Sequence, residues 1–187
     1  MMTGMSKMRA SAMAVPALVA MLVTGCSSDD GGEDPINVPT PSAEETGNGD
    51  ASAARDEAVL EALFLSYYDA LVQLENGEAE DGSVFEGIAV ETVIDEQVGR
   101  ALSFREVGLI SRGEPEITQV QATVDEDRGR IEACVNADNW QVYTEEGEVV
   151  PMDVPESDAT LLLAERGAEG WIISEHPSSA EGVAVTC

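Results

Sequence analysis

The chain has 187 residues, of which 43% are hydrophobic and only 4% aromatic. Its 37 acidic side chains outnumber 9 basic ones, giving a formal net charge of −28. Nucleic-acid binding depends on clustered Lys and Arg, so we expect no nucleic acid among the partners. The acids are spread along the chain, which favours a solvated surface, with an acidic patch for a basic partner as the alternative.

The N-terminal segment has the order of a secretory signal. Lys7 and Arg9 are its only charges, and they precede an apolar run over residues 10–23. This run is shorter than the roughly 20 residues that a membrane-spanning helix needs. We therefore predict a cleavable signal peptide over residues 1–25 rather than a permanent transmembrane helix.

The signal ends in Val23-Thr24-Gly25-Cys26, which resembles the lipobox of bacterial lipoproteins. The resemblance implies that Cys26 takes a diacylglyceryl group and becomes the first residue of the mature protein. Two acyl chains are enough for stable anchoring, whereas one is not. We expect an exported lipoprotein, with palmitate-type chains, held on the outer face of the bacterial cell membrane. The alternative is a cysteine that happens to lie near an ordinary cleavage site.

Residues 26–52 are predicted to form a lipidated, disordered, acidic tether. Pro35, Pro39 and Pro41 lie there among Gly, Ser and acidic residues, and such a segment buries too little surface to offset its ordering entropy. Loss of Lys7 and Arg9 with the signal leaves 7 basic against 37 acidic residues, a net charge of −30. The remaining residues, 53–187, are predicted to form one domain of ordinary size.

The domain is expected to begin with helices. Between residues 53 and 75 the apolar positions recur at spacings of three and four, as in an amphipathic helix: Leu60, Leu63 or Phe64, Tyr67, Leu71 and Leu74. We expect Asp56 and Glu57 in its first turn and Asn76-Gly77 at its end. A second, less regular helical stretch, broken in two, is predicted from Val84 to about Val107.

After Pro115 the apolar period changes from helical to alternating. Alternating residues on both sides of the turn at 125–129 predict a β-hairpin. A polar stretch over 136–155 separates it from two more predicted strands, at 159–165 and 171–174. Helices followed by antiparallel strands favour an α+β domain, with the N-terminal helices packed on a curved sheet.

Several positions resemble actinobacterial lipoproteins of the nuclear-transport-factor-2-like superfamily. The resemblance rests on the lipobox and tether together with Tyr67-Tyr68, Ala133-Cys134-Val135 before Trp140, and Gly170-Trp171-Ile172-Ile173. It implies a cone, in which a bent antiparallel sheet surrounds helices and a cavity lies at the open end. In this superfamily the cavity serves isomerases, dehydratases and many non-catalytic binding or assembly domains, so the fold alone does not choose a function.

The chain holds few groups with catalytic chemistry. His176 is its one histidine, and we interpret it as an exposed loop residue, because the sequence supplies no second member of a dyad. The candidate pocket consists of Tyr67, Trp140 and His176. The run Asp125-x-Asp127-x-Gly129 begins like a calcium loop but lacks its later ligands, so no metal or cofactor is expected.

We therefore expect a surface-anchored, non-enzymatic binding or assembly domain whose partner is an envelope protein or a small molecule. On this interpretation, replacing His176 by Ala leaves function intact. The alternative is a small-molecule isomerase or hydro-lyase that uses the cone cavity, with His176 or a helix tyrosine. A third possibility is a purely structural partner in an envelope or secretion complex, for which an exposed apolar patch would be the sign.

The cysteine count predicts a disulfide. If lipidation consumes Cys26, then Cys134 and Cys187 remain as a pair in an oxidising compartment. Cys134 lies mid-strand, whereas Cys187 follows an apolar tail that would fray unless it were held. We predict a bridge that fixes this tail against the sheet, with two free thiols as the alternative.

Overall fold

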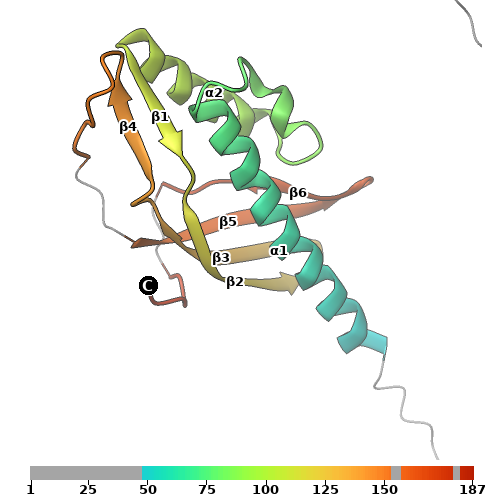
Figure 1. The fold of residues 1–187 in the computed structure, drawn as a ribbon. Helices are drawn as coiled ribbons and strands as arrows, with labels where there is room; N and C mark the ends of the chain where they lie inside the picture. The colour runs from blue at the N-terminus through green and yellow to red at the C-terminus, as the bar shows by residue number, and fades with distance from the viewer. Residues whose placement is uncertain (1–47, 153–156, 179–181) are drawn as a thin grey trace, which may run out of the picture. The chain divides into compact units, whose positions relative to one another are not determined.

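The computed structural model describes residues 48–152, 157–178 and 182–187 (Figure 1). Its elements belong to the second of the two units into which the chain divides, Ala43–Cys187. The predicted signal peptide, Cys26 and the predicted tether as far as residue 47 lie outside the described residues. Among the described helices, none has the length and apolar character needed to cross a membrane.

Helix α1 spans Asn48–Glu75 and supplies much of the core. Leu60, Phe64 and Tyr67 are fully buried, and Leu71 and Leu74 are nearly so, which confirms the predicted apolar face. The helix begins at residue 48, earlier than the expected residue 53. Residues 48–52, which were expected in the tether, are therefore helical.

The longer helix moves Asp56 out of the first turn, where we expected it, and into the third. Its carboxylate instead forms an ion pair with Arg166 at 2.5 Å and accepts a hydrogen bond from Trp171 Nε1 at 3.4 Å. The hydrogen bond from Arg166 is the main reason why the pKa of Asp56 lies below its usual value. Asp56 thus fixes α1 to the last β-hairpin rather than interacting with the helix dipole.

The expected break in the second helical stretch is present. A short 3-10 helix, η1, covers Gly82–Phe85, and α2 covers Glu91–Glu106. Arg105 of α2 donates hydrogen bonds to the Leu74 carbonyl at the end of α1 and to the Ala79 carbonyl. A cation near the C-terminus of a helix is favoured by the helix dipole, and these contacts join the two helices where α1 ends.

All strands pair antiparallel. They are β1 (Leu109–Gly113), β2 (Glu116–Asp125), β3 (Arg128–Asn136), β4 (Trp140–Thr144), β5 (Ser157–Gly167) and β6 (Gly170–Glu175). The main sheet has the order β2-β3-β5-β6, and β1 pairs with β4 in a second sheet. With two N-terminal helices on these sheets (Figure 1), the predicted α+β class is confirmed. Strands β1 and β4 were missed, because the sequence suggested a connector and a polar stretch there.

A bend joins the two sheets. Gly113 pairs with Trp140 in one ladder, and Glu116 pairs with Asn136 in the next, so β1 continues into β2 as β3 continues into β4. Gly113 has a φ of +91°, and a Cβ atom there would lie 1.8 Å from the Asn139 carbonyl oxygen. Glycine is therefore required at this corner, which turns β1 and β4 toward α2.

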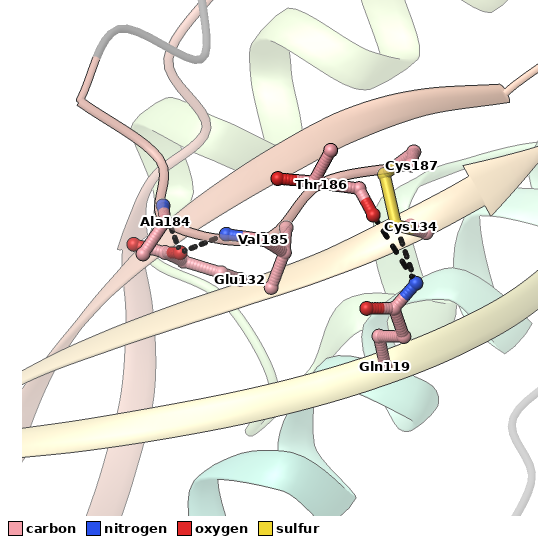
Figure 2. The surroundings of a disulfide bond; sticks show 7 residues. All are labelled: Gln119, Glu132, Cys134, Ala184, Val185, Thr186 and Cys187. Atoms are coloured by element: carbon pink, nitrogen blue, oxygen red, sulfur yellow. Dashed lines mark hydrogen bonds between the residues drawn. A yellow bond between two sulfur atoms is a disulfide. The ribbon is translucent and has the colours of Figure 1, made fainter.

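A disulfide joins Cys134 of β3 to Cys187, with their Cα atoms 5.6 Å apart, as predicted from the cysteine count (Figure 2). It fixes residues 182–187, the C-terminal strap, to the outer face of the main sheet. Ile131, Ala133 and Val135 point inward and pack in the helix-covered core. They alternate along β3 with the residues that hold the strap.

Glu132 and Arg130 hold the strap by polar contacts. Glu132 Oε2 accepts hydrogen bonds from the backbone amides of Ala184, at 2.6 Å, and Val185, at 3.2 Å, as Figure 2 shows. Its Oε1 accepts from Arg130 Nε at 2.6 Å, while Arg130 Nη2 donates to the Gly182 carbonyl. Burial raises the pKa of Glu132, but these hydrogen bonds outweigh burial and the net pKa is lowered. The buried carboxylate is thus ionised, and both of its oxygens accept hydrogen bonds.

Candidate functional site

Two hollows meet at Arg100 of α2, which lines both. The apolar hollow has a volume of about 440 Å³ and lies between α2 and the β1-β4 sheet. Most of its lining residues are apolar: Phe104, Ala137, Trp140, Val142, Val149, Val150, Pro151 and Met152. The polar hollow, of about 310 Å³, lies between α2, β5 and the end of β6.

The polar side chains of the apolar hollow are Glu75 with its partners Arg100 and Ser111, together with the exposed Asp138 and Gln141. Glu75 Oε1 accepts from Arg100 Nη2 at 2.5 Å, and Glu75 Oε2 accepts from Ser111 Oγ at 3.3 Å. Only 10% of the Glu75 side chain is exposed. Burial raises the pKa of Glu75, and the neighbouring Arg100 and Ser111 oppose this without cancelling it. The carboxylate and guanidinium form a polar spot within an otherwise apolar wall.

Trp140 is fixed at the sheet bend. Its Nε1 donates to Asn76 Oδ1 at 3.3 Å, and Asn76 Nδ2 donates to the Gly113 carbonyl at 2.8 Å. Asn76, which the sequence suggested only as a helix stop, therefore links the end of α1 to the corner of the sheet. The indole of Trp140 is held in the wall of the apolar hollow by this link.

Tyr67 and His176 meet although 109 positions separate them. The Tyr67 hydroxyl lies 2.9 Å from His176 Nδ1. Burial, with a smaller contribution from Arg100, lowers the pKa of His176 to about 4, and burial raises the pKa of Tyr67 above its usual value. His176 is therefore a neutral, half-buried residue, and our interpretation of it as an exposed loop histidine is wrong. Tyr67 lies on the buried face of α1, and His176 directly follows the last residue of β6. The two side chains therefore meet.

The contact with Tyr67 favours one tautomer of His176. A neutral imidazole carries its proton on one nitrogen only. If Nδ1 carried it, the Tyr67 hydroxyl would be the acceptor, and its own proton would have no acceptor in the described part of the chain. The arrangement that satisfies both groups has Tyr67 donating to Nδ1 and the imidazole proton on Nε2.

Gln97 was missed by sequence reasoning. It lies in the polar hollow with 3% of its surface exposed, and its Oε1 has no hydrogen-bond partner among the described residues. Its position in the sequence could have identified it. Val93, Gln97 and Ala101 are the buried residues of α2, and each is four residues after the one before. A glutamine that interrupts a buried helical face indicates a polar role there.

The predicted pocket is thus divided between the hollows. His176 lines the polar hollow with Tyr67 behind it, whereas Trp140 lines the apolar hollow. The predicted lipid site Cys26 lies outside the described residues. Cys134 and Cys187 lie on the outer face of the main sheet, away from the helix-covered core. Within the described ranges, no three His, Cys, Asp or Glu side chains are grouped as metal ligands would be. Glu75 and Arg100, which link the two hollows, were also missed.

Comparison with known proteins finds likeness in structure alone. No protein-family model matches the chain, and no curated protein matches it in sequence. The chain is similar to the intermembrane space region of the chloroplast protein ARC6, with 13% identity and a TM-score of 0.49 over 65% of this chain and 95% of that one. It is also similar to the Kfla4162 protein from Kribbella flavida, with 17% identity and a TM-score of 0.40 over 67% of this chain and 93% of that one. The function must be argued from the side chains of the site.

Proposed function

We propose that the protein is a lipoprotein of the nuclear-transport-factor-2-like type that binds a small molecule on the outer face of the bacterial cell membrane. The apolar hollow carries this proposal. Its volume of about 440 Å³ suits a small-molecule site, and such sites combine mainly apolar walls with a few placed polar groups. Here the polar groups are Glu75, Arg100, Ser111, Asp138 and Gln141. The bent sheet fits the expected cone.

Anchoring and export belong to the same proposal. Disulfides persist in oxidising compartments, and the Cys134–Cys187 bridge supports an extracytoplasmic location. The signal pattern and Cys26 support attachment to the membrane through lipid. The protein would then present its hollows to molecules or envelope proteins outside the cell membrane.

The groups around the hollows favour binding over catalysis. A general base works best when its pKa lies near the operating pH, whereas the pKa of His176 is lowered to about 4. The Glu75 carboxylate is already hydrogen-bonded to Arg100 and Ser111. His176 is therefore not poised to take a proton from a substrate at neutral pH, and the oxygens of Glu75 are occupied by its partners.

A small-molecule isomerase or hydro-lyase is the second candidate, and the Tyr67–His176 contact is the observation that favours it. The pair joins a hydroxyl and an imidazole at the edge of the polar hollow. Turnover that disappears in a folded His176→Ala variant would support this candidate. Binding that survives the substitution in a protein without turnover would support the non-enzymatic one.

The binding proposal is tested with two matched valine variants. Val149 is 50% exposed and lines the apolar hollow, whereas Val59 is 46% exposed on α1 and lines neither hollow. We would purify the chain from membranes and identify copurifying small molecules by mass spectrometry. We expect Val149→Glu to lose a molecule that the wild type and Val59→Glu retain, because a carboxylate in the wall repels an apolar ligand. Equal retention by both variants would contradict binding in this hollow.

A further inference from the structure

The outer face of the main sheet holds the C-terminal strap through the backbone of the strap. Three side chains of the sheet make these hydrogen bonds: Gln119, Arg130 and Glu132. The groups that they reach are the carbonyls of Gly182, at 2.8 Å, and Thr186, at 3.4 Å, and the amides of Ala184 and Val185 (Figure 2). Every extended peptide has such carbonyls and amides. The face is therefore built to recognise an extended chain.

Gln119 is positioned for this contact by an irregularity in β2. The register of β2 against β3 shifts between Thr118 and Gln121, and Gln119 has a φ of +54°. A left-handed conformation is unfavourable for a residue with a Cβ atom, and a bulge of this kind redirects a side chain. Gln119 Nε2 lies 3.4 Å from the Thr186 carbonyl oxygen and 3.5 Å from Cys134 Sγ. The unfavourable backbone thus occurs at the residue that contacts both the strap and the disulfide.

The strap buries little apolar surface of its own. Val185 is its one buried residue, with 8% of its surface exposed, and its other residues are half-buried or exposed. Glu132, which binds two strap amides, would stay paired with Arg130 and regain water if the strap moved away. Opening the strap therefore sacrifices few apolar contacts within the strap, and the disulfide becomes its main hold.

The disulfide can be opened from the side of the strap. Cys187 is exposed, whereas only 2% of the surface of Cys134 is exposed. The thiolate of a reducing thiol would attack Cys187 Sγ, and the electron pair of the broken S–S bond would pass to Cys134 Sγ, to which Gln119 donates. A second reducing thiolate then attacks the sulfur of the first and releases Cys187. The products are two protein thiols and the disulfide of the reductant.

We propose that the outer face of β2 and β3 is a peptide-binding site, which the chain's own strap fills while the disulfide is closed and which the strap of a second copy fills after thiol reduction. The second strap presents the same backbone groups, valine and cysteine. The Cys134 thiolate attacks a second-copy Cys187 that carries the reductant as a mixed disulfide, and the reductant leaves as its thiolate. The site lies apart from both hollows, so this inference does not depend on the proposed function.

A strap peptide tests the site in the full chain. The protein carries Cys26→Ala, so that Cys134 and Cys187 are its only cysteines. We would incubate it in a glutathione redox buffer with a peptide of residues 182–187, supplied as its mixed disulfide with glutathione. Mass spectrometry measures the peptide bound to Cys134, and tryptophan fluorescence reports whether the domain stays folded. Unfolding on reduction, or no adduct once the protein thiols are free, would overturn the proposal.

The matched control is the same peptide with N-methyl groups on the amides that correspond to Ala184 and Val185. N-methylation removes the two donors from which Glu132 accepts, while the cysteine is unchanged. Hydrogen bonds to a charged group are the stronger kind, so we expect at least about tenfold less adduct at Cys134 with this peptide. Equal capture of the two peptides would mean that Cys134 reacts with any disulfide and that the face recognises no backbone.

Exchange between copies is tested by mixing two full-chain variants in the same buffer, both with Cys26→Ala. Cys134→Ala supplies the strap cysteine, and Cys187→Ala supplies the cysteine of the face. We expect a dimer joined through Cys134 and Cys187, and about fivefold less of it when the second variant also carries Glu132→Gln, which loses the charge and keeps the shape. Dimers joined only through Cys187, or a yield that Glu132→Gln leaves unchanged, would contradict binding of a second strap.

Discussion

The Tyr67 hydroxyl lies 2.9 Å from His176 Nδ1, within hydrogen-bond distance. This contact connects the middle of α1 to the end of β6. With Tyr67 as the donor it requires a neutral imidazole, because protonation of Nδ1 removes its lone pair and reverses the direction of the hydrogen bond. The contact is therefore sensitive to pH.

The first prediction concerns that sensitivity. The pKa of His176 is lowered to about 4 in the folded protein from an ordinary value of 6.5. Between these values the unfolded chain binds more protons, so the free energy of unfolding falls as the pH drops below about 6.5. From pH 7 to pH 5 we expect His176 to account for a loss of up to about 2 kcal/mol.

Urea unfolding of the wild type and of His176→Gln, at pH 7, 6 and 5, measures this effect. Carboxylates titrate in both proteins, so the difference between the two isolates His176. We expect the wild type to lose stability more steeply than the variant as the pH falls. Parallel stability curves, or an imidazole that titrates near pH 6.5 by NMR, would show that His176 is not buried as a neutral group.

The second prediction is that Gln97→Leu stabilises the unliganded protein. The substitution removes a buried acceptor without a donor and adds apolar burial, so we expect the free energy of unfolding to rise by about 1–2 kcal/mol. Gln121→Leu, at an exposed position, should change it by less than about 0.5 kcal/mol. A clear destabilisation by Gln97→Leu would mean that the glutamine amide is satisfied within the protein.

The third prediction concerns the C-terminal strap. The disulfide spans 53 positions, for which the chain-entropy model gives about 4 kcal/mol of stabilisation as an upper value. This is a large part of an ordinary domain stability of about 5–15 kcal/mol. We expect the double variant Cys134→Ala/Cys187→Ala to lose up to that amount in denaturant unfolding, and reduction of the wild type to cause a similar loss. Two titratable thiols in unfolded, unreduced mature protein would exclude the bridge.

The fourth prediction tests the anchor. Protein from an expressing bacterial host should partition into detergent and carry a lipid mass on Cys26, with residues 1–25 removed. Cys26→Ala should be released or remain unprocessed, whereas Cys187→Ala should stay in the membrane fraction. An unmodified Cys26 that is still joined to residues 1–25 would disprove lipidation.

The fold was predictable where one physical signal dominates. The helical repeat of α1 follows from the burial of one face, and the hairpin at 125–129 follows from alternation on both sides of a turn. Strands β1 and β4 are short and were missed. In β4 the residues Trp140, Val142 and Tyr143 lie among polar neighbours, and its pairing with β1 depends on the bend at Gly113. That bend arises from tertiary structure, so the local pattern of apolar residues does not indicate it.

The candidate site was predictable only in part. Tyr67 and His176 were selected for their chemistry, but their contact depends on where β6 ends relative to α1. Glu75 and Arg100 resemble ordinary surface charges in helices, and only the tertiary packing buries Glu75 and places Arg100 beside it. The disulfide was predictable because it depends on a count of cysteines and on the chemistry of the compartment, and not on the path of the chain.

The strap also covers a charged group. Residues 182–187 follow the six strands β1 to β6 in the chain, and the amides of Ala184 and Val185 bind Glu132 on the outer face of β3. A chain that stops short of these residues would leave a carboxylate and a free thiol on the bare outer face of β3. Such a product differs chemically from the finished one and is open to proteases and to mispaired thiols. Closure of this face therefore depends on the strap as well as on the sheet.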